Sequence, residues 1–466
     1  MDMKKIKNAE VLLGTGDSKS REIVLGILDR TLVRMDSYYV LKGITSLKGK
    51  ILTIGEKSWD LTQKRNIYLI GAGKAANAMA KVFDELLGAE LADGIVVVKI
   101  VEEKDKYEHV RMFQGGHPLP NEGSYQASLE VLKMVEEMNE DDLVIGLMSG
   151  GNSALLSCPM EGMTLEDEMQ TRDVMLKSGA SVVEVNAVCR HISRVNGGRL
   201  AQAIEAKGAE MICILIMDAL GFPATECPGK PREFGFTQMA PDATTLEDAK
   251  NAIKNYDVAD KLPPKVVEFY QNCTEKDETP KSLKKWTGYI INTLPDVSKV
   301  AKEEAEKMGL RAMVLTNALI GESSEAGNFM ASIAAEIQAS GQPIAPPCVV
   351  IATGEVSAKI PEQPKGIGGP GQELAAGFAI AARKLRGPCI ASVDTEGTDG
   401  PTDSAGGLAD SKTFWLSEEK GIDLYEALRN HAVYEALSPL NSEIITGNTG
   451  TNLCDLHIMY VPEGEV

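Results

Sequence analysis

Four short glycine-rich segments carry the residues whose types and spacing could do chemistry. The first is GAGKAA, residues 71–76, directly after the apolar run NIYLI. Glycines let backbone N–H groups approach an anion, and the N-terminus of a following helix adds a favourable dipole. A lysine at this position, Lys74, is unfavourable next to the positive end of the helix dipole. Its presence therefore indicates that it binds an anion. Gly71, Gly73 and Lys74 are therefore candidates for contacting a phosphate group.

The second segment is SGGNSALL, residues 149–156, which follows the apolar run DLVIGLM. Two glycines flanked by small polar residues form a backbone nest with hydroxyl donors, a phosphate-binding pattern that lacks the Gly-Lys-Ser/Thr ending of a P-loop. Taken alone, the segment is equally well explained as a capped helix start. The candidate phosphate ligands here are Ser149, Gly150, Gly151, Asn152 and Ser153.

A third segment, DTEGTDGPTDSAGG at residues 394–407, concentrates carboxylates directly after the apolar run PCIASV. Ligands of open α/β sheets bind beyond the carboxyl ends of strands, where this segment is expected to lie. Its spacing does not match an EF-hand, whereas Mg²⁺ shared between carboxylates and substrate phosphates fits Asp394, Asp399 and Asp403. The alternative is a turn-rich loop in which Asp and Gly serve the backbone.

The fourth segment is TGNTGTNLCDL, residues 446–456, in which small donors and glycines precede a final apolar run. Beside the other three it is a further candidate anion nest, with Thr449 and Asn452 as ligands. Two histidines also attract attention, His117 in GGHPLP and His191 in a helix-like stretch. A histidine in either setting is more often a structural, hydrogen-bonded residue than a catalyst.

GAGKAA also fits the glycine-rich turn of a dinucleotide-binding fold, with Ala76 in the third small position. Such folds place an acidic residue at the end of the next strand, where it binds the ribose. The next apolar run here, GIVVVK, ends in Lys99 instead. This exchange disfavours a nicotinamide cofactor.

The strands that precede these loops must position them. NIYLI, GIVVVK, DLVIGLM and AEMICILIMD are short and almost wholly apolar, which predicts central strands of a parallel sheet with both faces covered. Residues 181–208 predict one long helix that is broken, or closely approached by another backbone, at its glycine pair. After the polar stretch 271–285, strand–helix alternation restarts with GYIIN, RAMVLTN, PCVVIATGE and PCIASVD.

A chain of 466 residues exceeds what one core normally supports, so we expect an α/β protein of two domains, residues 1–285 and 286–466. The net charge of −19 argues against nucleic acid and anionic membranes as partners. No apolar run reaches the roughly 18 residues of a membrane span. The eight cysteines form no C-x-x-C pair, which favours reduced thiols in the cytoplasm.

In this order, the segments resemble the glycerate 2-kinase family of the MOFRL type, once labelled as hydroxypyruvate reductases. The resemblance also rests on GGHPLPNEGS, EVNAVCRHISRVNGGRLA, PDATTLEDA, TGE and GIGGPGQELA, and it covers most of the chain. It implies a Rossmann-like N-terminal domain with a parallel sheet, a smaller α/β C-terminal domain and an active site in the cleft. It also implies phosphate transfer from ATP, with Mg²⁺, to the 2-hydroxyl of glycerate or to a related hydroxy or sugar acid.

The resemblance suggests roles for individual residues. Lys74 matches the family's candidate catalytic lysine, which would neutralise charge on the transferred phosphoryl group. Asp218 and Asp399 are candidates for the base or for a metal ligand. The small-molecule acid would be bound by the 184–201 helix and the GGPGQE turn, through Asn186, Arg190, His191 and Glu373. A homodimer is compatible with the sequence.

The chain departs from the family pattern on the side of the acid substrate. Pro370 stands where the family typically has an arginine, and a longer segment, residues 227–240, replaces a Ser-Gly-Pro stretch. Because arginine binds carboxylate and phosphate bidentately, its loss is expected to weaken binding of a small acidic product. Two alternatives to a kinase stay open: an oxidoreductase acting on hydroxypyruvate, and a catalytically silent relative that binds a ligand.

Overall fold

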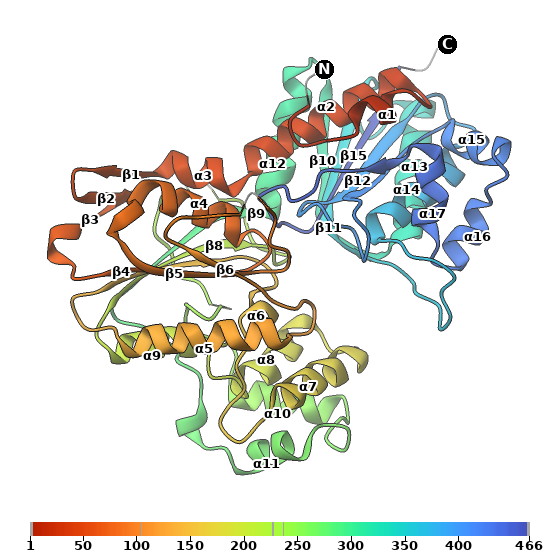
Figure 1. The fold of residues 1–466 in the computed structure, drawn as a ribbon. Coiled ribbons are helices and arrows are strands. Elements are labelled where there is room, and N and C mark those ends of the chain that lie inside the picture. Colours follow the sequence, from red (N-terminus) through yellow and green to blue (C-terminus); the bar gives the residue numbers. More distant parts are fainter. Residues whose placement is uncertain (1–2, 104, 226–227, 236, 464–466) are drawn as a thin grey trace. The chain divides into compact units, whose positions relative to one another are not determined.

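The protein forms two compact α/β units (Figure 1). The computed structural model describes residues 3–103, 105–225, 228–235 and 237–463. Unit 1 comprises Met1–Val40, Met217–Glu226 and Asn292–Val466, and unit 2 comprises Leu41–Ile216 and Cys227–Ile291. Within the described part, no helix is long and apolar enough to cross a membrane, and all seven cysteines carry free thiols. Cys227, the eighth cysteine, lies outside the described residues.

Unit 2 is built on a six-stranded sheet of order β6-β5-β4-β7-β8-β9. Counted along the chain within this sheet, that order is the 3-2-1-4-5-6 arrangement of a Rossmann fold. The strand pairs from β6 to β8 are parallel. The strand order reverses between β4 and β7, and ligands of such sheets bind beyond the carboxyl ends of strands at this point. The strands are β4 (Ile67–Ala72), β5 (Leu91–Val98), β6 (Arg111–Gln114), β7 (Leu143–Met148), β8 (Glu210–Met217) and β9 (Trp286–Thr293).

Helices cover this sheet, which explains why its central strands are apolar throughout. β4 and β7 are buried at every residue. Two helices pack on the sheet, α4 (Ala76–Leu87) against β4 and β5, and α5 (Glu122–Glu136) against β5 and β6. A small antiparallel sheet precedes β4, made of β1 (Thr45–Lys48), β2 (Ile51–Ile54) and β3 (Lys57–Asp60). A further group of helices shares its own apolar core: α7 (Leu165–Lys177), α8 (Val182–His191), α10 (Leu246–Asn255) and α11 (Pro264–Asn272).

The predicted helix over residues 181–208 is two helices, α8 and α9 (Arg199–Ala206). They are separated at the glycine pair, where Gly198 has a φ of 76°. A Cβ at Gly198 would lie 2.4 Å from the carbonyl oxygen of Ala240, so only glycine fits. The break and the close backbone approach that the glycine pair predicts are both present.

Unit 1 contains a mixed six-stranded sheet of order β10-β11-β15-β12-β13-β14. β10 and β11 are parallel, and the remaining pairs are antiparallel. Helices α2 (Ser18–Met35) and α12 (Leu294–Lys307) pack together on the sheet, and α13 (Ser323–Ser340) and α14 (Pro370–Ala382) pack together on its other side (Figure 1). The strands are β10 (Arg311–Glu322), β11 (Cys348–Ser357), β12 (Cys389–Asp394), β13 (Gly406–Asp410), β14 (Glu443–Ile444) and β15 (Asp455–Val461).

Short helices complete unit 1. Three of them, with α14, surround the core on one side of the sheet. They are α15 (Thr413–Glu419), α16 (Leu424–Arg429) and α17 (Val433–Leu437), while α1 (Ala9–Leu13) lies near β14 and α3 (Ser37–Ile44) leads into unit 2.

The division of the chain differs from the predicted domains 1–285 and 286–466 in three places, one of which is Met217–Glu226, a short segment that belongs to unit 1. Residues 1–40 belong to unit 1, because α2 packs on β12 and β15 of that unit's sheet. The run GYIIN, expected to open the second domain, forms β9 and completes the sheet of unit 2. The mixed character of the sheet in unit 1 is a feature that its apolar runs do not predict, since β15 returns antiparallel between β11 and β12.

Candidate active site

The loops after β4 and β7 meet at the carboxyl edge of the unit 2 sheet. The backbone N–H of Lys74 donates to Gly150 O at 3.0 Å, and that of Ala75 donates to Ser149 Oγ at 3.0 Å. Gly73 has a φ of 136°, and a Cβ there would lie 2.1 Å from Ser149 Oγ. The two loops therefore fit together only with glycine at this position. The structure brings the first two predicted segments into one place.

A third loop, GGHPLP, follows β6 and reaches the same place. A Cβ on Gly151 would lie 2.9 Å from His117 Cδ2 and 3.4 Å from Lys74 Cγ. His117 and Lys74 are both half-buried. The imidazole ring of His117 and the side chain of Lys74 thus both lie beside Gly151. The sequence analysis did not place His117 in the site, although its position after a strand of the same sheet was a signal for it.

This arrangement can bind an anion, because Lys74 stands beside a glycine nest at the start of α6 (Asn152–Leu155). Asn152 Nδ2 donates back to Ser149 O at 2.7 Å, so this side chain braces the loop. Ser153 is half-buried on the same turn. Gly71 lies inside β4, where a Cβ would be 2.8 Å from Val96 Cγ2. Gly71 therefore allows close packing of β4 on β5, and its predicted role in binding a cofactor stays a prediction.

In unit 1, the other two predicted segments come together with Asp218. The N–H of Thr395 donates to Cys454 O at 2.9 Å, and Thr449 Oγ1 donates to Thr395 O. Asn452 Nδ2 donates to Asp218 Oδ2 at 3.2 Å. Thr449 and Asn452 are buried. These contacts of the two side chains hold the loops to one another and to Asp218 within unit 1.

Carboxylates gather around this junction. Burial raises the pKa of the Cys454 thiol well above its usual value, and the charges of Asp218, Glu355, Asp394 and Asp455 raise it further. Asp394 ends β12 directly opposite Asp455 at the start of β15. Both carboxylates also accept backbone hydrogen bonds, Asp394 from the N–H of Glu396 at 3.0 Å and Asp455 from the N–H of Val356 at 2.8 Å. Glu355 and Asp455 are not among the predicted site residues, although both fall in segments, TGE and NLCDL, on which the family resemblance rests.

The three carboxylates predicted to hold Mg²⁺ do not come together. Asp399 is buried and accepts the N–H groups of Gly371 and Gln372, at 3.0 and 2.8 Å, where α14 begins. Asp403 is exposed and accepts a hydrogen bond from Tyr434 at 2.8 Å. Among the described residues, no group of three or more His, Cys, Asp or Glu side chains could hold a metal ion.

Asp399 instead caps a helix. Pro370 is the first residue of α14 and needs no hydrogen-bond acceptor, whereas the next two N–H groups do. Burial raises the pKa of Asp399 to about 6, although the hydrogen bonds from Gly371 and Gln372 oppose the rise. The predicted roles of Asp399 as a metal ligand and as a base are therefore corrected to a structural one.

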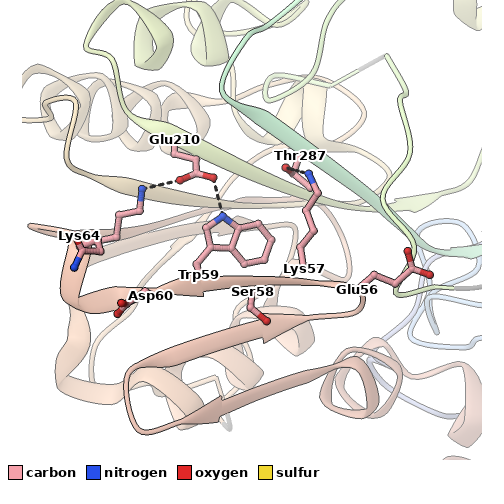
Figure 2. Close-up of a pocket in the computed structure, with 9 residues that line it drawn as sticks. Glu56, Lys57, Ser58, Trp59, Asp60, Lys64, Glu210 and Thr287 are labelled. Atoms are coloured by element: carbon pink, nitrogen blue, oxygen red, sulfur yellow. Dashed lines mark hydrogen bonds and ion pairs between the residues drawn. The ribbon is translucent and has the colours of Figure 1, made fainter.

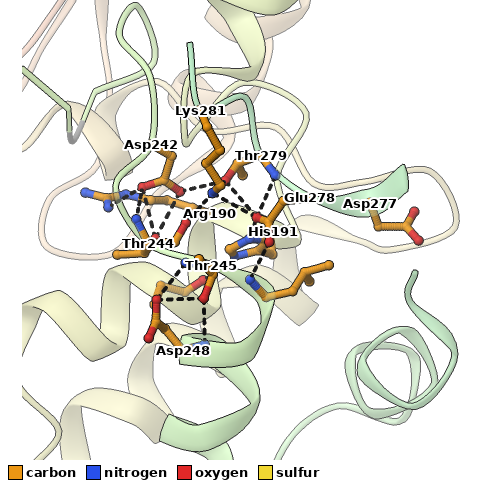
Figure 3. Close-up of polar contacts among 12 residues, drawn as sticks. Arg190, His191, Asp242, Thr244, Thr245, Asp248, Asp277, Glu278, Thr279 and Lys281 are labelled. Atoms are coloured by element: carbon orange, nitrogen blue, oxygen red, sulfur yellow. Dashed lines mark hydrogen bonds and ion pairs between the residues drawn. The ribbon is translucent and has the colours of Figure 1, made fainter. Parts of the chain in front are cut away.

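Arg190 and His191, predicted to bind the acid substrate, are committed to internal contacts (Figure 3). Arg190 Nη1 donates to Asp242 Oδ1 at 3.0 Å, and the two side chains are almost fully buried. His191 Nε2 lies 2.8 Å from Glu278 Oε1. Both partners, Asp242 and Glu278, lie within unit 2, so the two side chains are held by contacts inside that unit. The geometry does not support the predicted substrate contacts.

Glu278 gives this network a testable dependence on pH. Burial alone would raise its pKa, but hydrogen bonds from His191, the N–H of Leu246, Lys281 and the N–H of Thr279 lower it to about 2. The pKa in the folded protein is below the ordinary value of 4.5, so the stability that this carboxylate contributes is complete above pH 4.5 and is lost as the pH falls toward 2.

We therefore expect Glu278→Gln to lower the free energy of unfolding by about 2 kcal/mol at pH 7, because hydrogen bonds to a charged group are lost. The difference from the wild type should shrink as the pH is lowered from 4.5 to 3. Urea unfolding of both proteins at several pH values measures it. A difference that stays constant over this range would contradict the assigned pKa.

Two other predicted substrate ligands have different surroundings. Glu373 is buried, and it accepts a hydrogen bond from Ser323 Oγ at 2.7 Å and lies 2.8 Å from His431 Nδ1. These partners fill its oxygens from within unit 1, so the geometry does not support a role for Glu373 in binding substrate. Asn186 is half-buried on α8, and its predicted role remains a hypothesis.

A cavity of about 540 Å³ lies at the opposite edge of the unit 2 sheet, where β8 and β9 begin (Figure 2). Trp59 Nε1 and Lys64 Nζ both donate to Glu210, at 2.8 and 2.6 Å, and Lys57 Nζ donates to Thr287 Oγ1 at 3.1 Å. These polar groups are paired with one another. The cavity is thus remote from the loops at the carboxyl edge and is no part of the candidate site.

Comparison with known proteins decides the family. Residues 23–271 match a family described as "Domain of unknown function (DUF4147)", and residues 348–455 match the MOFRL family. A glycerate 2-kinase from Pyrococcus horikoshii is 36% identical over 95% of this chain and 97% of its own length. The chain belongs to the glycerate kinase family. A D-glycerate 2-kinase from Thermotoga maritima is also 36% identical, over 84% of this chain and 90% of its own.

The fold of this kinase family agrees with the structure described above. The crystal structure of glycerate kinase from Thermotoga maritima has a TM-score of 0.75 at 31% identity, covering 97% of this chain and 99% of that one. The family resemblance and the predicted α/β fold class are confirmed.

Proposed function

We propose that this protein is a glycerate kinase that transfers the γ-phosphoryl group of ATP to the 2-hydroxyl of glycerate, giving 2-phosphoglycerate and ADP. A related hydroxy or sugar acid is the second candidate acceptor, because Pro370 replaces an arginine of the family pattern. The observation that carries the proposal is the convergence of Lys74, the Gly150-Gly151 nest and His117 at the point where the Rossmann sheet reverses its strand order. Full-length similarity to glycerate kinases supports it.

Phosphoryl transfer needs positioning and charge stabilisation more than covalent help from the protein. In the proposed reaction, the backbone N–H groups of Gly150 and Gly151 bind nucleotide phosphate oxygens, as in other glycine nests. The Lys74 ammonium neutralises charge on the transferred group. The acceptor hydroxyl forms the new P–O bond, the bond to the ADP oxygen breaks, and the hydroxyl proton passes to a base. Asp218 remains the candidate base, since Asp399 is committed to α14.

Carboxylate oxygens are the protein ligands that Mg²⁺ prefers, and it is commonly held by one or two of them together with substrate phosphates. The predicted trio does not fit this requirement, whereas Asp394 does, since it ends a strand among other carboxylates. Asp394 would hold the ion, which would supply charge neutralisation for the phosphates. The acidic surroundings of Cys454 support this assignment.

The reaction itself is the first test. With ATP, Mg²⁺ and a panel of glycerate, other hydroxy acids and sugar acids, we expect ADP release to depend on the acid and to be fastest with glycerate. Hydroxypyruvate-dependent oxidation of NADH without ADP release would favour the oxidoreductase. Binding of ATP without turnover of any acid would favour the silent relative.

The seven free thiols of the described part support a reducing, cytoplasmic location.

A further inference from the structure

The short helix α6, which follows the Gly150-Gly151 nest, depends on side chains from elsewhere in unit 2. It has four residues, and a helix of that length is not stable by itself. The carbonyl groups of its last turn also lack partners within the helix. Gln238 Nε2 donates to Asn152 O at 2.7 Å and to Leu156 O at 3.3 Å. Asn196 Nδ2 donates to Ser153 O at 3.1 Å.

The two amide side chains also bind each other, and we call them the amide clamp. Gln238 Nε2 donates to Asn196 Oδ1 at 2.9 Å. Gln238 is fully buried and Asn196 is 2% exposed. Three acceptor oxygens surround the Gln238 nitrogen, and only the NH₂ end of an amide satisfies them, so its orientation is fixed.

The backbone holds the clamp in place. The N–H of Gly198 donates to Thr237 O at 2.9 Å, and the N–H of Ala201 donates to Gln238 O at 3.1 Å. These bonds tie residues 237–238 to the break between α8 and α9. Gln238 belongs to the segment 227–240, which lies between β8 and α10. Cys227 and Phe236 of that segment lie outside the described residues.

A shift of α6 would move the nest, and with it Lys74, whose N–H donates to Gly150 O at 3.0 Å. We propose that Gln238, supported by Asn196, is a positioning residue that aligns the N–H groups of Gly150 and Gly151 with the phosphates of the nucleotide. This inference rests on the proposed kinase function. It adds a residue that touches no reacting atom and acts through the backbone of α6.

The test is Gln238→Met, which keeps the length of the side chain and removes its donors. Loss of one or two net hydrogen bonds corresponds to about a tenfold effect. We expect the KM for ATP to rise about tenfold while the KM for the acid stays within about twofold. Hydrogen exchange of the amides of residues 152–156 should become faster without any ligand. Asn196→Asp, which keeps the acceptor for Gln238 but loses the donor to Ser153, should have a smaller effect in the same direction.

Tyr270→Phe is the matched control, because Tyr270 OH donates to Val188 O at 2.6 Å within the buried core of the helices around α8. It should lower the melting temperature and leave both KM values unchanged. An unchanged KM for ATP with unchanged exchange at 152–156 in Gln238→Met would overturn the clamp, as would the same rise in KM in Tyr270→Phe. If the wild type turns over no acid, the proposed function fails, and the exchange of α6 still decides the clamp.

Discussion

Lys74→Ala is expected to lower kcat by about 10²–10³-fold, the cost of removing one preorganised group that stabilises transition-state charge. The Lys74 side chain passes Gly151, where an added Cβ would lie 3.4 Å from Lys74 Cγ, and no other lysine falls within the three loops of the site. The KM for ATP should rise less than kcat falls, because the charge on the transferred group is concentrated in the transition state. Steady-state kinetics with ATP and glycerate measure both quantities.

Lys74→Arg keeps the charge but changes its shape, so it should retain more activity than Lys74→Ala. Lys81→Ala is the matched control, since Lys81 is half exposed on α4, the helix that follows the same loop. It should keep kcat within about twofold. Turnover by Lys74→Ala equal to that of the wild type would remove Lys74 from the proposed mechanism while leaving the phosphate nest to be tested separately.

The loops at the carboxyl edge of unit 2 could be predicted because their signal is local. An apolar run that ends in glycines, followed by a helical pattern, places Lys74 and Ser149 at the ends of strands without any knowledge of the sheet. The order of the strands in the sheet, which the sequence does not contain, then determines which loops lie side by side. It brings the loop of His117 to the same side as the other two loops. β6, β5 and β4 are parallel neighbours, so their carboxyl ends lie along the same edge of the sheet.

The acidic segment shows where such inference stops. Composition places Asp394 and Asp399 in one loop, but it cannot tell a metal ligand from a helix cap. The difference is made by α14, which begins at Pro370 and presents two N–H groups to Asp399. Two residues that are close in sequence therefore have different environments. Asp394 lies at a strand end among carboxylates, whereas Asp399 is buried at the start of a helix.

The sequence also could not predict which of the two units residues 1–40 belong to. An amphipathic pattern shows that α2 buries one face, but not which sheet receives it. The partner of Arg21 is Asp410, far along the chain, at 2.5 Å, and both side chains are fully buried. Long-range ion pairs of this kind leave no periodic signal, so the predicted boundary assigned these residues to the wrong neighbours.

Arg21→Met is expected to destabilise the protein by about 3–5 kcal/mol, the usual cost of leaving one partner of a buried ion pair uncompensated. The guanidinium also donates to Leu12 O and Thr15 Oγ1, both at 3.0 Å, and to Asn441 O at 3.2 Å. Methionine fills much of the space but satisfies none of these acceptors. Urea unfolding followed by circular dichroism measures the loss.

Two further variants separate charge from packing. Arg21→Met combined with Asp410→Asn removes the uncompensated charge and should recover part of the loss, because a neutral amide costs less to bury. Lys302→Ala breaks an exposed pair with Glu306 in the same unit and should cost less than about 0.5 kcal/mol. A loss below about 1 kcal/mol for Arg21→Met would mean that α2 is peripheral. The expected loss would instead place residues 1–40 in the cooperative core of unit 1, since Arg21 reaches that core only through α2.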